Sequence, residues 1–403
     1  MTRSTAVEDA PEEVAVLAKI GIETITDHQS FLDLEPVWNE VADAAGLGHP
    51  FLEYAWVRTW WESFGAGSTL HVLVLRAGHR PIAIAPLIMT PIRMWGIKVR
   101  RLGFFYNAHV PRADFLIAER TEEVYCAIWA HLSRNRQWDL LQLCQLQEGC
   151  ATLEEMPRLA APAQCPMGVW ASDVSPFVPL RPSWGEYFDS LTAKHRSNLR
   201  NRFKRLKAAA PLDIEAITSA EGLAEGLEDG LRLEAAAWKG EAQTAISSDP
   251  DISRFYSTLA GRAAERGWIR LHFLQTGGLR IAFDYSLYYK NRIHLLKLGY
   301  DPAYARFSPS NLLLCLVLQS AFKQGVTEYD FLGTNADWKL TWAKQVKRHY
   351  WLFVFPGTLK GRFLYLIKFH LAPLLKRPGL RYLGRLIQHT AAQWPRRGVR
   401  SEG

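Results

Sequence analysis

The pattern of apolar and polar positions repeats once along this chain of 403 residues. Two apolar runs at 72–75 and 82–85 flank Gly78, which predicts a strand, a tight turn and a second strand. The same spacing, Leu-x-x-Gly-x-x-x-Ile-Ala, returns around Gly277 in the second half of the chain. We therefore expect two similar units in tandem.

Helices and further strands are expected around each hairpin, in the same order in both halves. An apolar helix follows each hairpin, and a closing strand then begins at Trp138-Asp139 and at Tyr329-Asp330. The predicted helices span 31–45, 54–64, 124–132, 184–209, 220–237 and 311–323. Strands interleaved with helices favour a mixed α/β fold.

The length of the chain also favours two domains, since one hydrophobic core rarely grows to this size. Pro176, Pro179 and Pro182 predict the join, because proline interrupts regular structure. The predicted divisions are a disordered N-terminus (1–21), a first domain (22–174), a second domain (175–355) and a basic amphipathic helical tail (356–403).

Composition is that of an ordinary globular protein, with 48% hydrophobic and 22% charged residues. The five cysteines form no C-x-x-C pair, so neither a disulfide framework nor a metal site is expected. Residues 1–11 carry no signal pattern, and no apolar run approaches the roughly 20 residues of a membrane span. We expect a cytoplasmic protein.

Positive charge is concentrated at the C-terminal end. Residues 356–403 contain ten Lys and Arg residues and one acidic residue, Glu402, among leucine and aromatic residues. Such a segment can contact an anionic membrane surface peripherally. It can equally pack on its own domain with its charges in solvent, so both interpretations stay open.

An ordered series of motifs occupies the second half of the chain. The motifs are Trp238-Lys239, Phe255-Tyr256, Leu298-Gly299-Tyr300-Asp301, Arg306 to Asn311, Tyr329 to Gly333 and Trp338 to Trp342. In this order they resemble the BioF2-like acetyltransferase family associated with cellulose and exopolysaccharide synthesis, a relative of GNAT and FemAB proteins. The first half is similar more weakly, through Trp56, Trp60-Trp61 and Ala85-Pro86-Leu87.

The resemblance implies a tandem pair of GNAT-like domains and an acyl-CoA-dependent N-acyltransferase. The implied acceptor is an amino group of a sugar or amino sugar in polysaccharide or cell-envelope synthesis. Two alternatives remain: a FemAB-type transferase that draws on aminoacyl-tRNA, and a non-catalytic partner of a membrane polysaccharide synthase. Without the tRNA alternative, no nucleic-acid partner is expected, because one basic helix is too little for such an interface.

In a GNAT fold two strands part to admit pantetheine, and the pyrophosphate rests on the next helix N-terminus. The resemblance places the first parted strand at 295–300. The implied acyl-CoA-binding residues are Leu298, Tyr300, Tyr304, Arg306, Ser308, Pro309, Ser310 and Asn311. The turn lacks the glycines usual in such loops, so a plain alternative is that Ser308 caps the helix and Pro309 starts it.

Several residues are candidates for catalysis and acceptor binding. Asp284 is the first candidate base, Tyr285 can protonate the leaving thiolate, and Lys339 can stabilise an oxyanion, as an active-site lysine does in FemAB-like relatives. Glu234 is a second candidate base, although an ordinary surface position on a helix explains it better. The expected acceptor-binding residues are Arg196, Arg200, Trp238, Lys239 and Trp338.

One further motif is set aside. His109 and Asp114 have the H-x-x-x-x-D spacing of glycerolipid acyltransferases, but no F-P-E-G stretch follows them. We therefore expect His109 to be an ordinary loop residue.

Overall fold

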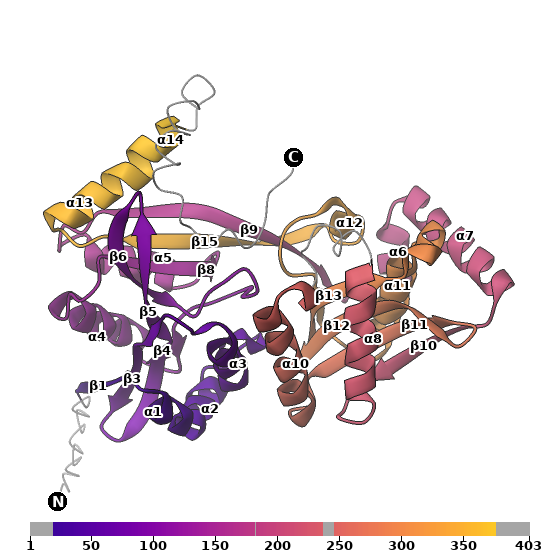
Figure 1. Ribbon diagram of the computed structural model, residues 1–403, viewed down its shortest axis with the longest axis horizontal. Helices are drawn as coiled ribbons and strands as arrows, with labels where there is room; N and C mark the ends of the chain where they lie inside the picture. The colour runs from indigo at the N-terminus through magenta and orange to yellow at the C-terminus, as the bar shows by residue number, and fades with distance from the viewer. Residues whose placement is uncertain (1–18, 182, 237–245, 376–403) are drawn as a thin grey trace, which may run out of the picture.

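The structure, a computed structural model, describes residues 19–181, 183–236 and 246–375. Figure 1 shows two α/β units side by side, with the N-terminal unit on the left and the second unit on the right. Two long strands, β9 (Met167–Pro179) and β15 (Gln345–Val354), run between the units. The predicted tandem arrangement of mixed α/β units is confirmed.

The N-terminal unit contains the first predicted hairpin, which turns at Gly78 with φ of +64°. Helix α3 (Tyr54–Phe64) begins and ends at the predicted residues. The other elements, with a short 3-10 turn at Pro50–Leu52, are β1 (Ile20–Ile25), α1 (His28–Asp33), α2 (Glu35–Ala44), β2 (Thr69–Leu70), β3 (Val72–Ala77), β4 (Arg80–Ala85), β5 (Leu87–Met94), β6 (Ile97–Phe104), β7 (Leu116–Ile117), α4 (Thr121–Arg134), β8 (Leu140–Gln147) and α5 (Thr152–Ala160).

The second unit repeats the central part of this order, in which a hairpin is followed by a further strand, a helix and a closing strand. Its elements are α6 (Trp184–Ser190), α7 (Ala193–Ala209), β10 (Leu212–Ile217), α8 (Leu223–Ala236), η2 (Ile246–Ser248), α10 (Pro250–Glu265), β11 (Ile269–Thr276), β12 (Leu279–Tyr289), β13 (Arg292–Tyr300), η3 (Pro302–Phe307), α11 (Pro309–Lys323), β14 (Glu328–Asp330) and α12 (Asp337–Leu340). A C-terminal helix follows as α13 (Leu359–Leu366), a π-helical turn η4 (Ile367–Leu371) and α14 (Ala372–Leu375). No helix in these described ranges is both long and apolar enough to cross a bilayer.

The two units exchange strands. Eleven strands form one sheet in the order β10-β11-β12-β13-β14-β9-β15-β8-β6-β5-β2. Strand β9, which follows the first unit's β8, pairs with β14 of the second unit. Strand β15, which follows β14, pairs with β8 of the first unit. Each unit is therefore completed by a strand from the other.

This exchange revises the predicted join. The boundary between 174 and 175 falls inside β9, and Pro176 and Pro179 lie within the strand. The Pro176 carbonyl accepts from the Phe331 amide at 3.0 Å. Because the N–H and C=O of one strand residue point to the same side, the missing N–H of Pro176 faces β14 and costs no bond to β15. Proline here marks a change of partner within a strand.

Three smaller predictions also differ from the structure. The helix predicted at 184–209 is two helices, because Thr192 accepts the His195 amide at 3.2 Å and starts a new helix. The N-terminal segment predicted as disordered (1–21) overlaps β1, which begins at Ile20, while 1–18 lie outside the described residues. The closing strand predicted at Trp138 begins at Leu140.

Helices also join the units directly. Helix α10 packs on α3, where the Trp56 and Phe255 rings meet edge to face with centroids 5.3 Å apart. Arg262 on α10 pairs with Glu62 on α3 at 2.7 Å. A shared sheet and a shared helix interface hold the two units as one body, so a site between them has fixed walls.

Candidate active site

Strands β13 and β14 pair and then diverge. They are parallel over three residue pairs, of which His294 and Asp330 are the last. Beyond that pair β13 continues to Tyr300 against β12 alone, whereas Phe331 turns towards β9. We call this divergence the strand fork. It begins where the sequence predicted the first parted strand.

A cavity of about 210 Å³ occupies the strand fork. Its lining comes from both units: Ala108, His109, Val110, Pro111, Gln145, Asp173, Ser175, Tyr256, Leu295, Leu296, Lys297, Leu332 and Gly333. Pockets that enclose drug-sized ligands measure roughly 300–1,000 Å³. The fork cavity can therefore hold a transferred group and one small unit of an acceptor, with the rest of both substrates outside.

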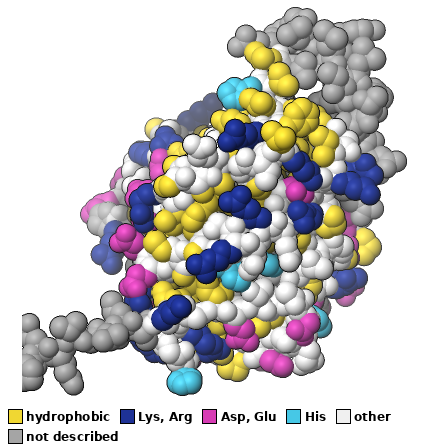
Figure 2. Space-filling view, turned by 90° about the vertical axis from the view of Figure 1, so that its left-hand side faces the viewer, with side chains coloured by type: hydrophobic (Ala, Val, Ile, Leu, Met, Phe, Trp, Pro, Cys, Tyr) yellow, Lys and Arg dark blue, Asp and Glu magenta, His cyan; other side chains and the backbone are white. Residues whose placement is uncertain are grey.

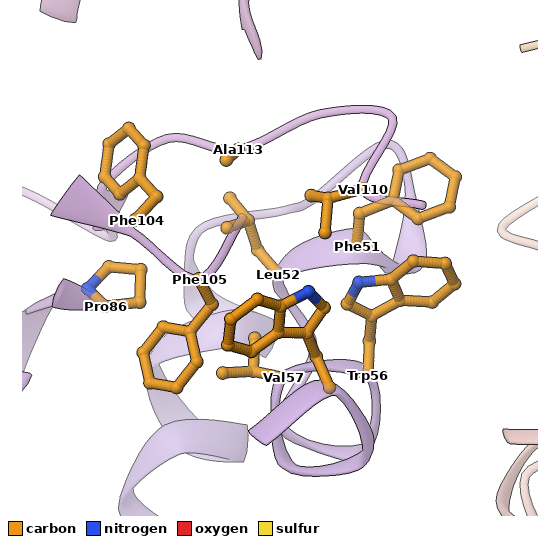
Figure 3. Close-up of a pocket in the computed structure, with 10 residues that line it drawn as sticks. Phe51, Leu52, Trp56, Val57, Pro86, Phe104, Phe105, Val110 and Ala113 are labelled. Carbon is orange, nitrogen blue, oxygen red and sulfur yellow. The ribbon is translucent and has the colours of Figure 1, made fainter. Parts of the chain in front are cut away.

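The corresponding gap in the first unit is closed. Strands β6 and β8 are also parallel and also diverge, beyond Gly103 and Gln142. There the chain's own loop enters, since the Ala113 amide donates to the Gln145 carbonyl at 3.2 Å. Figure 3 shows the aromatic rings of Phe51, Trp56, Phe104 and Phe105 gathered around what remains, a space of about 10 Å³. That volume is about that of one water-sized probe.

Three titratable side chains meet at the fork cavity. The Nδ1 atom of His109 lies 3.1 Å from the Tyr256 hydroxyl, and the Lys297 ammonium lies 4.9 Å from the centre of the Tyr256 ring. Burial, and then the charge of Lys297, lowers the pKa of His109 to about 4. Burial raises the pKa of Tyr256 and lowers that of Lys297. At neutral pH the imidazole is therefore unprotonated and the phenol keeps its proton.

Two carboxylates lie beside this group. Asp173 lines the cavity and accepts from the Gln145 side-chain amide at 2.7 Å. Glu234 is only 1% exposed and accepts the Ile246 amide at 2.9 Å, so it is not a surface residue. Its negative charge acts on Lys297 against the effect of burial, in the direction that raises the lysine pKa.

The far wall of the cavity is an unusual turn. Leu332 and Gly333 both have left-handed backbones, with φ of +49° and +57°. Lys339 donates to the Leu332 carbonyl at 2.5 Å, and the Ser175 hydroxyl donates to the Gly333 carbonyl at 3.1 Å. The predicted oxyanion role of Lys339 stays a prediction. Its buried ammonium reaches the wall of the cavity through this backbone contact.

A buried ionic network lies at the base of the fork. Arg112 from the first unit pairs with Asp330, which also accepts from Lys347 at 3.0 Å. Burial alone would raise the pKa of Asp330, but the charges of Arg112 and Lys347 outweigh it and hold the pKa below its usual range. His294 is fully buried next to this network, and neither ring nitrogen has a hydrogen-bond partner among the residues described.

The implied acyl-CoA residues form one continuous path. Leu298 and Tyr300 lie on the open arm of β13, Tyr304 and Arg306 on η3, and 308–311 at the start of α11. Ser308 is the N-cap residue and Pro309 starts the helix, as the plain alternative has it, although Ser308 has a left-handed backbone (φ +48°) and its side chain makes no capping bond. The Ser310 hydroxyl instead donates to the Gly299 carbonyl at 3.3 Å.

Two guanidinium groups flank this helix start. The Arg306 guanidinium lies 4.7 Å from the centre of the Phe307 ring and that of Arg205, on α7, lies 5.6 Å from it. Arg205 was not among the predicted site residues. The sequence marked its helix as basic but gave no signal for which of its faces meets η3.

Asp284 and Tyr285 do not line the cavity. Asp284 is fully buried and accepts from Ser286 at 2.5 Å and from Tyr329 at 2.9 Å. Tyr285 points to the other side of the sheet and donates to the Tyr256 carbonyl at 3.1 Å. Their catalytic roles stay predictions that this placement does not favour, and Tyr285 instead supports the backbone of Tyr256.

The predicted acceptor-binding residues are not brought together. Arg196 donates to the Leu191 carbonyl at 2.8 Å, and the Arg200 guanidinium lies 5.4 Å from the centre of the Phe188 ring. Both contacts hold α7 to α6. Trp338 is 38% exposed and packs against Phe331 beside the turn at 332–333. Trp238 and Lys239 lie outside the described residues.

Comparisons with known proteins agree with this geometry. Residues 193–340 match a family model described as "Acetyltransferase (GNAT) domain". These residues form a GNAT domain. The strand fork of β13 and β14 lies within the matched residues, and the chain is an acyltransferase. No curated protein matches the sequence.

Solved structures share the fold over nearly the whole chain. FemX is similar with a TM-score of 0.54 at 11% identity, over 85% of this chain and 99% of FemX. The C-terminal domain of a protein named as a lysylphosphatidylglycerol synthetase, from Agrobacterium fabrum, has a TM-score of 0.50 at 14% identity, over 86% and 97%. A protein of unknown function from Bacteroides thetaiotaomicron has a TM-score of 0.51 at 8% identity, over 83% and 100%. The likeness includes both units around the GNAT fork and concerns the fold alone.

Two features of the site were missed from the sequence. His109 was expected to be an ordinary loop residue, yet it reaches Tyr256 across 147 residues of sequence. Lys297 was seen only as part of a strand. Groups of three or more metal-ligating side chains do not occur in the part of the chain that the structure describes.

Proposed function

We propose that this protein transfers an acyl group from acyl-CoA to an amino group held in the fork cavity. The supporting observation is that the second unit has an open strand fork with a cavity, whereas the matching gap in the first unit is filled. The pantetheine arm would lie along the open side of β13, and the diphosphate near the start of α11, with Arg306 and Arg205 beside it. Specific recognition of an acetyl group is part of the proposal.

The His109–Tyr256 pair would manage the protons of the transfer. The amine nitrogen attacks the thioester carbonyl carbon, the C–S bond breaks, and the thiolate takes a proton. Because the His109 pKa is about 4, its imidazole is unprotonated at neutral pH and can accept the proton of the amine. The Tyr256 hydroxyl, protonated and 3.1 Å from His109 Nδ1, would give its proton to the thiolate and regain one from the protonated His109.

An amino sugar is the proposed acceptor. Gln145, Asp173, Ser175 and Tyr256, with an amide, a carboxylate, a hydroxyl and a phenol ring, are among the residues that line the cavity. Sugar hydroxyls need many hydrogen-bond partners, which these polar groups offer. A role in polysaccharide or cell-envelope synthesis would follow from such an acceptor, with the enzyme in the cytoplasm.

The fold likeness to FemX favours a second candidate, a transferase that draws on aminoacyl-tRNA. Both candidates use the strand fork, but they differ in donor. An aminoacyl-tRNA donor would bind with steep salt dependence, since each neutralised phosphate releases counterions.

Calorimetric titration with acetyl-CoA tests the donor. Saturable binding is expected, and Arg306→Ala or Arg205→Ala should weaken it about tenfold, since a charge-assisted hydrogen bond contributes roughly 1.5–3 kcal/mol. Arg254→Ala is the matched control, because Arg254 is exposed on α10 and pairs with Asp251. Absence of acetyl-CoA binding, together with salt-sensitive binding of aminoacyl-tRNA, would replace this proposal by the second candidate. Full activity in His109→Gln and Tyr256→Phe would remove the proton pair from the mechanism.

A further inference from the structure

The C-terminal helix has two apolar faces, and only one of them is packed. Leu364 is fully buried, and the Phe369 ring meets Phe353 and Trp170 at centroid distances of 5.7 and 5.4 Å. Thr358 caps the helix by accepting the Gly361 amide at 3.1 Å. The helix is therefore anchored on the sheet, and its outer face is held in a fixed position.

The outer face of this helix exposes large apolar side chains. We call it the outer apolar face: Leu359, Phe363, Leu366, Leu371 and Leu374, with exposures of 88%, 51%, 50%, 49% and 41%. The first three follow the i, i+4, i+7 spacing of one helix face. Figure 1 shows α13 and α14 at the upper left margin of the molecule, and Figure 2 shows hydrophobic side chains gathered at the top of that side. An exposed apolar cluster of this kind marks an interaction site.

Positive charge surrounds the outer apolar face. Residues 356–375 contain three Lys and Arg residues and no Asp or Glu. Arg362 is exposed beside Phe363, and Lys360 shares the Asp139 carboxylate with Arg100, so two cations meet one anion there. The adjoining β5–β6 hairpin adds exposed Arg93 and Lys98. A second copy of the chain seated symmetrically on this face would bring like charges together, whereas an anionic surface would be attracted.

We propose that the outer apolar face docks this protein on an anionic lipid bilayer. The leucine and phenylalanine side chains enter the boundary between headgroups and acyl chains, while the flanking cations contact lipid phosphates. The helix lies in the plane of the surface, because its inner face stays packed on the sheet. This inference is independent of the proposed acyl transfer, since it concerns a face on which no fork-cavity residue lies.

Vesicle sedimentation with the full chain tests the proposal. The wild type should pellet with vesicles of phosphatidylglycerol and phosphatidylcholine, much less with phosphatidylcholine alone, and less as salt screens the charges. The double variant Phe363→Ser/Leu366→Ser should partition at least about a hundredfold less, since each of the two apolar side chains contributes roughly tenfold or more when buried. Ile214→Ser/Leu279→Ser, at exposed positions of 36% and 61% on β10 and β12, is the matched control and should bind as the wild type.

Urea unfolding of the same variants separates loss of docking from loss of fold. Equal pelleting of the wild type and the Phe363→Ser/Leu366→Ser variant would overturn the proposal. Equal pelleting of the wild type with neutral and anionic vesicles would also overturn it. A wild type that ignores vesicles but forms a dimer, which the double variant loses, would assign the face to a second copy instead.

Discussion

His294 should make this protein sensitive to acid. The imidazole lies at the last paired position of the strand fork, fully buried, 5.3 Å from the Phe51 ring centroid. Burial lowers its pKa from 6.5 to about 3, and the charges of Arg112 and Lys347 add to this effect. Between pH 6.5 and about pH 3, His294 is therefore protonated in the unfolded chain but not in the folded chain. Stability therefore falls as the pH falls from about 6.5 towards 3.

The expected magnitude follows from the two pKa values. Each pH unit over which only the unfolded form is protonated costs about 1.4 kcal/mol. At pH 5, about 1.5 units below the unfolded pKa, His294 should therefore lower the free energy of unfolding by about 2 kcal/mol. The full loss below pH 3 would be about 5 kcal/mol, which is a large part of the roughly 5–15 kcal/mol that stabilises a domain.

Urea unfolding of the wild type and His294→Leu at pH 7.5 and pH 5.0 measures this loss. The drop in free energy between the two pH values should be about 2 kcal/mol smaller in the variant. At pH 7.5 the variant should be at least as stable, because neither ring nitrogen has a partner among the described residues. The matched control is His79→Gln, at the exposed turn between β3 and β4. Equal acid sensitivity of wild type and variant would refute the reasoning.

Two further substitutions test the packing around the fork. In Gly299→Ala, the new Cβ would lie 2.5 Å from the Glu234 backbone nitrogen, so thermal unfolding should show a loss of about 1–3 kcal/mol, whereas Gly261→Ala on α10 meets nothing within 4 Å and should be neutral or stabilising. A neutral Gly299→Ala would mean that α8 is not fixed against β13. Arg112→Met leaves Asp330 with Lys347 as its remaining cation, and urea unfolding should show a loss of about 3 kcal/mol. A loss below about 1 kcal/mol would count against the ionic network as a lock between the units.

Local patterns in the sequence were enough for the repeated unit. The hairpin glycines and the helix 54–64 follow from spacing within about a dozen residues, and α3 occupies that helix. Such local patterns could not predict which strands pair when they are far apart in the sequence. The join was predicted at Pro176, Pro179 and Pro182 because proline interrupts regular structure, yet the N–H that Pro176 lacks would face Phe331, beyond β14, and not β15.

The site was predicted only where it follows the chain. The donor path that the resemblance implies, which stays a proposal, runs along residues 295–311, one uninterrupted strand, turn and helix start. His109 belongs to a loop of the other unit, and nothing in its neighbours' sequence indicates Tyr256 as its partner. Asp284 has the residue type of a base, but burial and two hydroxyl partners place it in a structural network. Residue type indicates chemistry only after the fold has decided which groups meet.

One loop links the two roles of the duplicated units. After β6 the chain runs through His109 to Ala113, whose amide bonds to Gln145 and fills the gap of the first unit. The same loop places His109 against Tyr256 and lines the fork cavity of the second unit. One conformation of this loop thus both fills the gap of the first unit and covers the fork of the second unit. Because β9 and β15 are exchanged, the two units share one sheet, and this loop lies over the fork. Residues of the first unit therefore form one wall of the second unit's cavity, so the fork cavity is complete only with both units present.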